Sequence, residues 1–503
     1  MAYPFSSVEG MNPADHVLDP VTLKKIGEIK AEVLKRVKPT RSEVDHTRDV
    51  TSRVSMTLQA AMGAGSVAID FIEPQGSTGL KQTQLAGDSD VDLFIGLNPG
   101  LLDAYKGMPK KQTKEQLKAT FTRLIKEVLI PAIRDALQPE SITFSYAEHP
   151  YLSTVVDGVK FDVVFCFNLT TEFIEREDIV TAMDRTPLHS KFVRDNLSDA
   201  QKDDVRLLKA FFKASHVYGD KSAPGPMGFI GYGVEIMVHY FGTLENVLVN
   251  IPLLHSQPID VFDRDKDSLR ATPRFANDFI ILIDPTDRNR NVGASMDQRC
   301  FTHAIHVIGQ FLREPSVTFF DIKPIEAPEN VDPYFQALVF DNTREAHYTI
   351  VRDKLYRLGN LARKKLEQEQ TGEERFGTMI FSVLLAKDEL QAAIAFHVQQ
   401  TNIPALYKQL GPSKQDARAR ITKYLQQHQD ALIDENDSYY IERTRKTTGF
   451  TDALAKFFKE ELDIKGLTLV QGSDGMIVST SPEHVVGRQA IHVLKTMILP
   501  YMS

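Results

Sequence analysis

The sequence has no tryptophan and only two cysteines, Cys166 and Cys300, among 503 residues. Two cysteines cannot form a disulfide framework, which favours a reducing compartment and predicts a cytoplasmic protein. No apolar run approaches the roughly 20 residues that a membrane helix needs. The N-terminal stretch has no basic start followed by an apolar run, so we expect no secretory signal peptide. These absences argue against a secreted disulfide scaffold and against a membrane-spanning protein.

An excess of positive charge is also missing, because 59 Lys and Arg face 67 Asp and Glu, a net charge of −8. That balance argues against a surface coated with nucleic acid. It does not exclude local RNA contacts, since binding depends on a patch and not on the sum. Basic clusters at 352–365 and 442–446 fit either RNA contacts or solvated faces. At this length the chain exceeds one hydrophobic core, and we expect about three domains.

Hydrophobic periodicity predicts an α+β protein with several domains. The first 170 residues read as helices followed by a small mixed sheet, and the middle of the chain is more helical. An Asp-Gly pair inside 142–169 predicts a hairpin turn between strands. The predicted helices are 23–40, 41–62, 114–137, 203–219, 228–251, 345–369, 413–430 and 450–463, with strands ending near 75, 97 and 169 and at 376–386 and 392–398.

Two aspartates stand at the front of an apolar strand in GDSDVDLFIGL (87–97). Side chains two positions apart on a strand share a face, so Asp90 and Asp92 converge at one edge of the sheet. Neighbouring carboxylates repel each other, and a divalent cation with oxygen ligands relieves that repulsion. The alternative is that this Asp-Ser-Asp stretch only caps the strand in a loop.

Two further features favour a metal and phosphate site. Gly76 and Ser77 form a predicted turn between a strand and a helix, where backbone N–H groups and a hydroxyl can hold a triphosphate. Asp162 lies inside a later strand between Phe161 and Val163. A buried hydrogen bond would explain Asp162 alone. With Asp90 and Asp92, a three-carboxylate, two-metal centre is the better explanation.

Gly-Ser, the stretch SDVDLF and a later strand aspartate resemble the signature of the polymerase-beta-like nucleotidyltransferases. Longer segments narrow this resemblance to the archaeal-type (class I) CCA-adding enzymes, the tRNA nucleotidyltransferases. It is strongest over 76–320 and extends more loosely to the C-terminus. The segments are AEHPYLSTVVDGVKFDVVFCF, TAMDRTPLHSKFV, DDVRLLKAFFKASHVYGD, GFIGYGVEIMVHYFG, DPTDRNRNVGASM and FLREPSVTFF.

The resemblance implies a multi-domain α+β fold with a catalytic head (1–180), a helical nucleotide-binding neck (181–300) and an α/β body and tail that bind tRNA (301–503). It implies addition of C, C and A to the 3′ end of tRNA from CTP and ATP, without a nucleic-acid template. Two Mg²⁺ ions would act as cofactors. The acceptor stem and T arm of tRNA would be bound, and the family is often a homodimer.

The resemblance also implies roles for individual residues. Asp90, Asp92 and Asp162 would be the catalytic and metal-binding carboxylates. Residues expected to contact the nucleotide are Gly76, Ser77, Lys81, Thr186, His189, Lys209, Tyr218, Asp287 and Arg290. Four of them have a simpler explanation when taken singly. Lys209 would be a solvated lysine, Tyr218 a packing tyrosine, His189 a core histidine and Arg290 a helix-capping arginine.

One departure concerns the loop GSTGLKQT, which is one residue longer than the family pattern and has Gln82 where a glycine is expected. Glutamine tolerates positive φ poorly, so we expect this loop to follow a different backbone path.

Two other functions fit parts of the same pattern. One is another template-independent transferase that adds only A or makes oligoadenylates. The other is a non-catalytic RNA-binding relative, although such a protein has no reason to keep all three aspartates.

Overall fold

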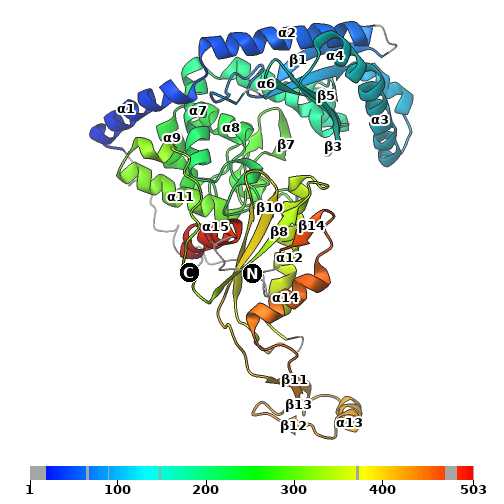
Figure 1. Cartoon of the computed structure of the whole chain (residues 1–503), viewed down its shortest axis with the longest axis vertical. Helices are drawn as coiled ribbons and strands as arrows, with labels where there is room; N and C mark the ends of the chain where they lie inside the picture. Colours follow the sequence, from blue (N-terminus) through cyan, green and yellow to red (C-terminus); the bar gives the residue numbers. More distant parts are fainter. Residues whose placement is uncertain are drawn as a thin grey trace. The chain divides into compact units, whose positions relative to one another are not determined.

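A computed structural model describes residues 18–63, 67–88, 90–146, 149–369, 373–470 and 484–501. The chain divides into two compact units, shown in Figure 1. Of the described residues, those within 18–219 and 227–322 form the larger unit, and those within 220–226 and 323–501 form the smaller. The predicted three-part division at 180 and 300 stays a prediction.

A five-stranded sheet forms the first part of the larger unit, in the order β1-β2-β5-β4-β3. Strand β2 pairs in parallel with β5, and the other neighbours are antiparallel. This is the mixed sheet that the sequence predicts. The strands are β1 (Ile69–Gln75), β2 (Val91–Leu97), β3 (Ser141–Tyr146), β4 (Pro150–Val156) and β5 (Val159–Phe167).

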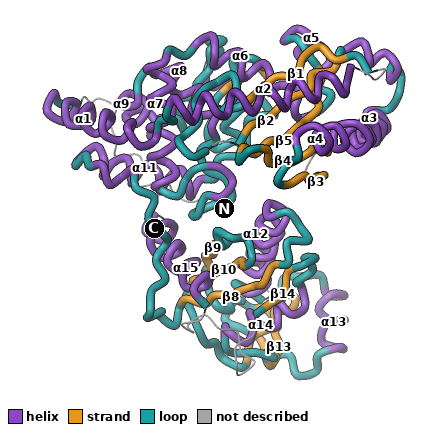
Figure 2. Tube along the Cα trace, turned by 45° about the horizontal axis from the view of Figure 1, so that its top comes forward, coloured by secondary structure: helices purple, strands orange, loops and turns teal. Residues whose placement is uncertain are grey.

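Side chains along β2 and β5 alternate between two faces, and the second carries the two aspartates and then the buried Phe94, Val164 and Cys166. Leu93 and Ile95 of β2, with Phe161 and Val163 of β5, are buried against a helical layer. That layer consists of α2 (Arg41–Gly63), α3 (Lys110–Leu124) and α4 (Ile130–Leu137), the purple helices around the orange strands of Figure 2. Asp92 and Asp162 therefore lie on the opposite face of the sheet.

A second core of the larger unit is made almost entirely of helices. Its centre is α7 (Asp199–Ala214) packed against α8 (Gly231–Phe241). Phe211 of α7 contacts Phe311 and Phe320, so residues after 300 belong to the same core. The surrounding elements are α1 (Pro20–Val37), α6 (Thr186–Asn196), α9 (Leu244–Asn250), α11 (Gln298–Arg313) and the hairpin β6 (Ile283–Asp284) and β7 (Asp287–Asn291).

The smaller unit is built on an antiparallel sheet in the order β14-β8-β10-β9. Helices α12 and α14 cover one face and α15 covers the other, because alternate side chains of β10 enter the two cores. The elements are β8 (Phe335–Asn342), α12 (Tyr348–Leu366), β9 (Met379–Leu385), β10 (Gln391–Val398), α14 (Phe450–Glu461), β14 (Leu467–Leu469) and α15 (Val485–Val493).

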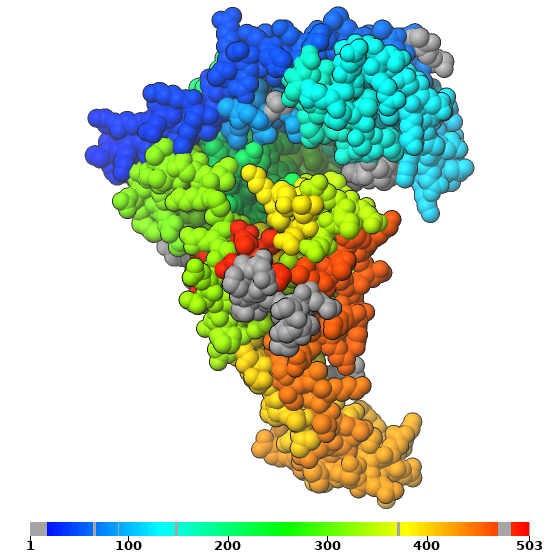
Figure 3. Space-filling model, viewed as in Figure 1, coloured from blue at the N-terminus to red at the C-terminus, as the bar shows by residue number. Residues whose placement is uncertain are grey.

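A three-stranded sheet in the order β11-β13-β12 projects from this unit, in yellow and orange at the bottom of Figure 3. Exposed Leu406 and Leu410 of β11 and Leu432 of β12 leave it with a thin core. Its elements are β11 (Leu406–Ser413), α13 (Arg418–Gln427), β12 (Leu432–Ile433) and β13 (Ser438–Thr444).

The structure confirms the predicted α+β class and the Asp-Gly hairpin turn, where Asp157 and Gly158 have φ of 48° and 74°. The continuous helix predicted over 228–251 is wrong. It ends at Gly242, whose φ of 90° closes α8, and Thr243 then caps α9 with its side chain. Glycine permits this backbone turn at low cost.

No helix of the described ranges is long and apolar enough to cross a membrane. The signal-peptide prediction rests on the N-terminal stretch, and residues 1–17 lie outside the described residues.

Candidate functional site

Three carboxylates gather near the N-terminal ends of β2 and β5, with Asp90 just before β2. Asp92 lies directly opposite Asp162 in the parallel register. Lys160, two residues before Asp162, donates to Asp90 Oδ2 at 3.0 Å and lies 3.9 Å from Asp162 Oδ2. The structure thus brings together the three aspartates that the sequence predicts, with one lysine among them.

The charge of this group acts most strongly on Asp92. Protein atoms crowd its carboxylate and raise its pKa to about 6, and the negative charges of Asp162 and Asp90 add to this effect. One side of Asp92 stays exposed to solvent. Lys81 and Lys160 lower the pKa only in part. The negative charge of the three aspartates is thus only partly neutralised. A bound cation would stabilise the charged form of Asp92.

The chemistry of these residues fits a divalent cation. Their donors are oxygens only, and Asp162 Oδ1 is buried without a hydrogen-bond partner among the described residues. In the described ranges no three His, Cys, Asp or Glu side chains are arranged closely enough to hold a metal ion. The Lys160 ammonium lies between the carboxylates of Asp90 and Asp162, at 3.0 Å and 3.9 Å from their Oδ2 atoms.

The loop after β1 closes over the carboxylates. Gly76 has a φ of 68°, and a Cβ there would come within 2.7 Å of Asp92 Oδ2. Its N–H donates to Ser190 Oγ at 3.3 Å. The carbonyl groups of Gly76 and Ser77 accept from the N–H groups of Lys81 and Thr83. The sequence predicted a helix after Gly-Ser. The structure instead has hydrogen-bonded turns through Lys81 and no helix before β2 in the described part of the loop.

Gln82 adopts a φ of 54°, so the expectation that glutamine would avoid positive φ here is wrong. Tertiary hydrogen bonds explain this conformation. Arg206 of α7 donates to the carbonyl oxygens of Gln82 and, at 3.0 Å, Gln84. A charged donor to two carbonyls of the same loop can offset the modest cost of left-handed backbone.

Lys81 and Lys209 meet at a buried carboxylate, that of Glu235 in α8. Lys81 Nζ donates to Glu235 Oε2 at 2.7 Å, and Lys209 Nζ lies 3.5 Å from Oε1. Thr83 Oγ1 donates to the same Oε1 at 2.6 Å, while Lys209 donates to the Thr83 carbonyl at 3.0 Å. Glu235 is 1% exposed. This cluster fastens the loop to α7 and α8.

The pKa values of the cluster follow from burial opposed by pairing. Burial alone would raise the pKa of Glu235, but Lys81 and Lys209 hold it below its ordinary value. Burial lowers the pKa of Lys209 to about 8, with Glu235 opposing the change and Lys81 adding to it. Because the cluster is buried, each charged side chain is stabilised by its oppositely charged partners and not by water.

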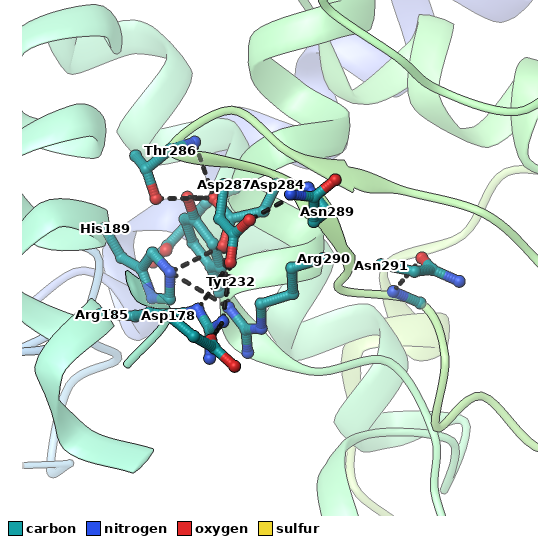
Figure 4. Close-up of polar contacts among 12 residues, drawn as sticks. Asp178, Arg185, His189, Tyr232, Asp284, Thr286, Asp287, Asn289, Arg290 and Asn291 are labelled. Atoms are coloured by element: carbon teal, nitrogen blue, oxygen red, sulfur yellow. Dashed lines mark hydrogen bonds and ion pairs between the residues drawn. The ribbon is translucent and has the colours of Figure 1, made fainter. Parts of the chain in front are cut away.

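A second polar cluster surrounds Asp284, which is fully buried (Figure 4). His189 Nε2 lies 2.8 Å from Asp284 Oδ2, and Arg290 donates to the same oxygen at 2.9 Å. Tyr232 and Thr286 donate to Oδ1 through their hydroxyls. His189 also stacks on the Tyr232 ring with centroids 4.0 Å apart. Asp284 therefore orients the side chains of both His189 and Arg290, two of the predicted residues.

Burial lowers the pKa of His189 to about 4, and Arg290 and Lys81 add to this although Asp284 opposes it. The imidazole is therefore neutral at pH 7. Its Nε2 lies 2.8 Å from Asp284 Oδ2 and 3.0 Å from Arg290 Nη1, and the tautomer sets whether it donates to the carboxylate or accepts from the guanidinium. Burial alone would raise the pKa of Asp284, but His189 and Arg290 hold it well below its ordinary value.

The remaining predicted residues lie around these two clusters. Asp287 binds Arg185 at 2.7 Å and also accepts from the Asn289 N–H of its own strand at 3.0 Å. Thr186 starts α6, one turn before His189. Tyr218 follows α7, and its hydroxyl lies beside Gly231, 3.1 Å from where a Cβ would stand. Burial raises the pKa of Tyr218 well above its ordinary value, so its hydroxyl stays protonated.

Lys81 joins the clusters into one site. Its ammonium is paired to Glu235 and lies 4.7 Å from the centre of the Tyr232 ring, whose hydroxyl binds Asp284. Ser190, next to His189, binds Gly76 beside Asp92. A chain of mostly buried polar contacts therefore links the carboxylates to Arg290.

Proteins similar to this chain are known. A family model described as "tRNA nucleotidyltransferase, second domain" matches residues 203–321, which contain Lys209, Glu235, Asp284 and Arg290. A CCA-adding enzyme of Pyrobaculum neutrophilum is 28% identical over 436 residues, covering 86% of this chain and 94% of that enzyme. Over most of its length the chain is therefore similar to CCA-adding enzymes.

Other relatives agree. The CCA-adding enzyme of Pyrobaculum aerophilum is 27% identical and covers 92% of this chain and 99% of that enzyme. That of Methanocaldococcus jannaschii is 31% identical over 59% of this chain and 61% of that enzyme. Among solved structures, a cytoplasmic RNA terminal U-transferase matches with a TM-score of 0.42 and 13% identity, covering 61% of this chain and 100% of that one. That similarity is too low to carry an argument.

Sequence reasoning missed three residues that organise the site: Arg206, Glu235 and Asp284. Glu235 stands in the apolar stretch GYGVEIMVHYF, where a single acid between valine and isoleucine was the available signal. Asp284 directly precedes Pro285 in the same motif as the predicted Asp287 and Arg290. Arg206 carried no signal, since one more basic residue on a helix is unremarkable in sequence.

Glu235→Gln should destabilise the larger unit. It leaves Lys81 and Lys209 buried without their carboxylate, and breaking a buried ion pair costs about 3 kcal/mol or more. Urea unfolding followed by circular dichroism measures this loss. Glu245→Gln is the matched control, because Glu245 pairs with Lys30 at 3.0 Å but both side chains are partly exposed. Its cost should stay below about 1 kcal/mol. Equal losses in the two variants would contradict the importance of Glu235.

His189 should remain neutral far below the ordinary histidine range. Its folded pKa of about 4 lies below the unfolded value of about 6.5. The unfolded chain therefore takes up a proton first, and the stability contributed by neutral His189 is lost as pH falls from 6.5 towards 4. In NMR spectra of ¹³C-labelled histidine, the resonance absent from His189→Gln should titrate near pH 4. A midpoint near 6.5 would refute the buried neutral ring.

Proposed function

We propose that this protein adds C, C and A to the 3′ end of tRNA, taking the nucleotides from CTP and ATP and releasing pyrophosphate. The observation that carries the proposal is the face shared by Asp92 and Asp162, joined through Gly76 and Lys81 to the Asp284 cluster. Nucleotidyl transfer needs carboxylates at the phosphates and hydrogen-bond donors at the base, and these residues offer both.

Asp90, Asp92 and Asp162 are our candidates for holding the divalent ions that nucleotidyltransferases use, which we expect to be two Mg²⁺. Such ions supply positive charge to the transferring phosphate and to the leaving pyrophosphate. The carboxylates of this chain would also position the attacking 3′ hydroxyl. Asp162 suits that role best, because Oδ1 is buried and unpaired while Oδ2 lies near Lys160.

The loop and α7 are our candidates for the triphosphate. Gly76 allows the backbone to approach Asp92 closely, and the Ser77 hydroxyl and the Tyr218 hydroxyl are neutral donors. Lys81 and Lys209 supply positive charge, and their pairing with Glu235 supports a further role in fixing the loop.

His189, Thr186, Asp287 and Arg290 are our candidates for the base. The neutral His189 ring and the Arg290 guanidinium are both anchored on Asp284, so the donors of Arg290 are held in one orientation. A planar guanidinium can donate to acceptor atoms of cytosine and of adenine. Asp287 holds Arg185 nearby and is the weaker candidate.

The tRNA itself would be recognised by shape and phosphates more than by sequence. We propose that its acceptor stem and T arm contact the smaller unit, including basic residues within 352–365 and 442–446. A cytoplasmic location and a homodimer remain predictions.

The test uses tRNA transcripts that end at the discriminator base, after one C, or after two C, with labelled CTP and ATP in Mg²⁺. The protein should add C, C and A in that order and stop. Asp92→Asn should lower the rate by about a hundredfold or more, because it removes an ion ligand worth several kcal/mol in the transition state. Asp103→Asn is the control, since Asp103 is exposed and pairs only with Lys106 in the described structure.

Each other outcome points elsewhere. Addition of A alone would indicate a restricted adenylyltransferase. Full activity in Asp92→Asn would exclude the carboxylate site. Tight tRNA binding with no incorporation by the unsubstituted protein would indicate a non-catalytic RNA-binding relative.

A further inference from the structure

Lys160 is a basic residue placed among the carboxylates, and none of the roles above requires it. On β5 it lies two positions before Asp162, so both side chains project from the same face of the sheet. The neighbours Val159 and Phe161 point the other way and are buried in the core. Strand geometry therefore fixes Lys160 beside the carboxylates.

The contacts of Lys160 are with the residues expected to bind metal. Its ammonium donates to Asp90 Oδ2 at 3.0 Å and lies 3.9 Å from Asp162 Oδ2. Its side chain is 45% exposed, against 63% for Asp90 and 29% for Asp162. An exposed lysine on a flexible stem can leave such a pair without a large cost.

Without a cation, three carboxylates on one face repel each other, and one positive charge between two of them reduces that repulsion. A divalent cation needs the same carboxylate oxygens. The Lys160 ammonium and a metal cation therefore compete for Asp90 Oδ2.

We propose that Lys160 is an internal counter-ion: it holds Asp90 and Asp162 in the metal-free protein and competes with divalent cations for them. Lys160 is thus a positioning residue that sets the cation concentration at which the site fills. The inference rests on the proposed function, since it assumes that these carboxylates are the metal ligands.

The proposal predicts how substitutions of Lys160 change the affinity for a divalent cation. Removing the Lys160 charge should tighten binding of a divalent cation by about two- to fivefold, the range expected for an exposed ion pair. Keeping the charge in Lys160→Arg should leave the affinity near that of the unsubstituted protein. Lys160→Met should also lower the melting temperature of the metal-free protein, and added cation should restore it.

The experiment measures Mn²⁺ binding by electron paramagnetic resonance of the free ion, with no nucleotide, RNA or turnover. The proteins are the unsubstituted chain, Lys160→Met, Lys160→Arg, Asp92→Asn and the control Lys106→Met. Lys106 pairs with Asp103 at 2.9 Å on the surface, so its loss removes the same charge elsewhere.

We expect tighter Mn²⁺ binding in Lys160→Met alone and weakened binding in Asp92→Asn. Equal affinities of Lys160→Met and the unsubstituted protein, with weakened Asp92→Asn, would overturn the counter-ion role but keep the metal site. Unchanged binding in Asp92→Asn would instead overturn the proposed metal site. Tighter binding in Lys106→Met as well would show a general charge effect and also refute the inference.

Discussion

The buried carboxylate of Glu235 is the interaction on which the site depends. It lies on α8 and holds Lys81 and Thr83 from the loop, together with Lys209 from α7. A charge 1% exposed is tolerated only because two ammonium groups and a hydroxyl surround it. Through these bonds, a loop that belongs to the sheet is positioned by the helical core.

This anchoring explains why parts of two cores form one site. The sheet contributes Asp92 and Asp162 because strand alternation leaves them on the face away from α2 and α3. The helical core contributes His189 and Arg290, both oriented by Asp284. Lys81 lies between the two, bound to Glu235 and resting against Tyr232. Displacing the loop would disturb together the contacts that we propose for the phosphates and for the base.

Local patterns were enough to predict the parts of the fold with a clear period. The orientation of Asp92 and Asp162, away from the core residues that flank them, follows from the period of two in a strand. The hairpin at Asp157 and Gly158 follows from turn chemistry.

The misses arose where tertiary contacts decide local structure. Gln82 takes positive φ because Arg206, 124 residues away, binds its carbonyl group. The turns after Gly76 replace an expected helix because their hydrogen bonds close back onto the loop. Glu235 and Asp284 gain their importance from burial, which a single sequence does not display. In the smaller unit, β11 and β13 carry too few buried side chains for a clear alternation, and only their pairing defines them.

The most direct test of the whole account is a crystal structure with Mn²⁺ and a non-hydrolysable CTP analogue, using anomalous scattering to locate the ions. Our account predicts anomalous peaks bound by Asp90, Asp92 and Asp162, with Lys160 moved away. It also predicts the triphosphate against Gly76 and Ser77, and the cytosine within hydrogen-bond reach of Arg290. Ions at other residues, or a base bound away from the Asp284 cluster, would contradict the claim that these two clusters serve one nucleotide.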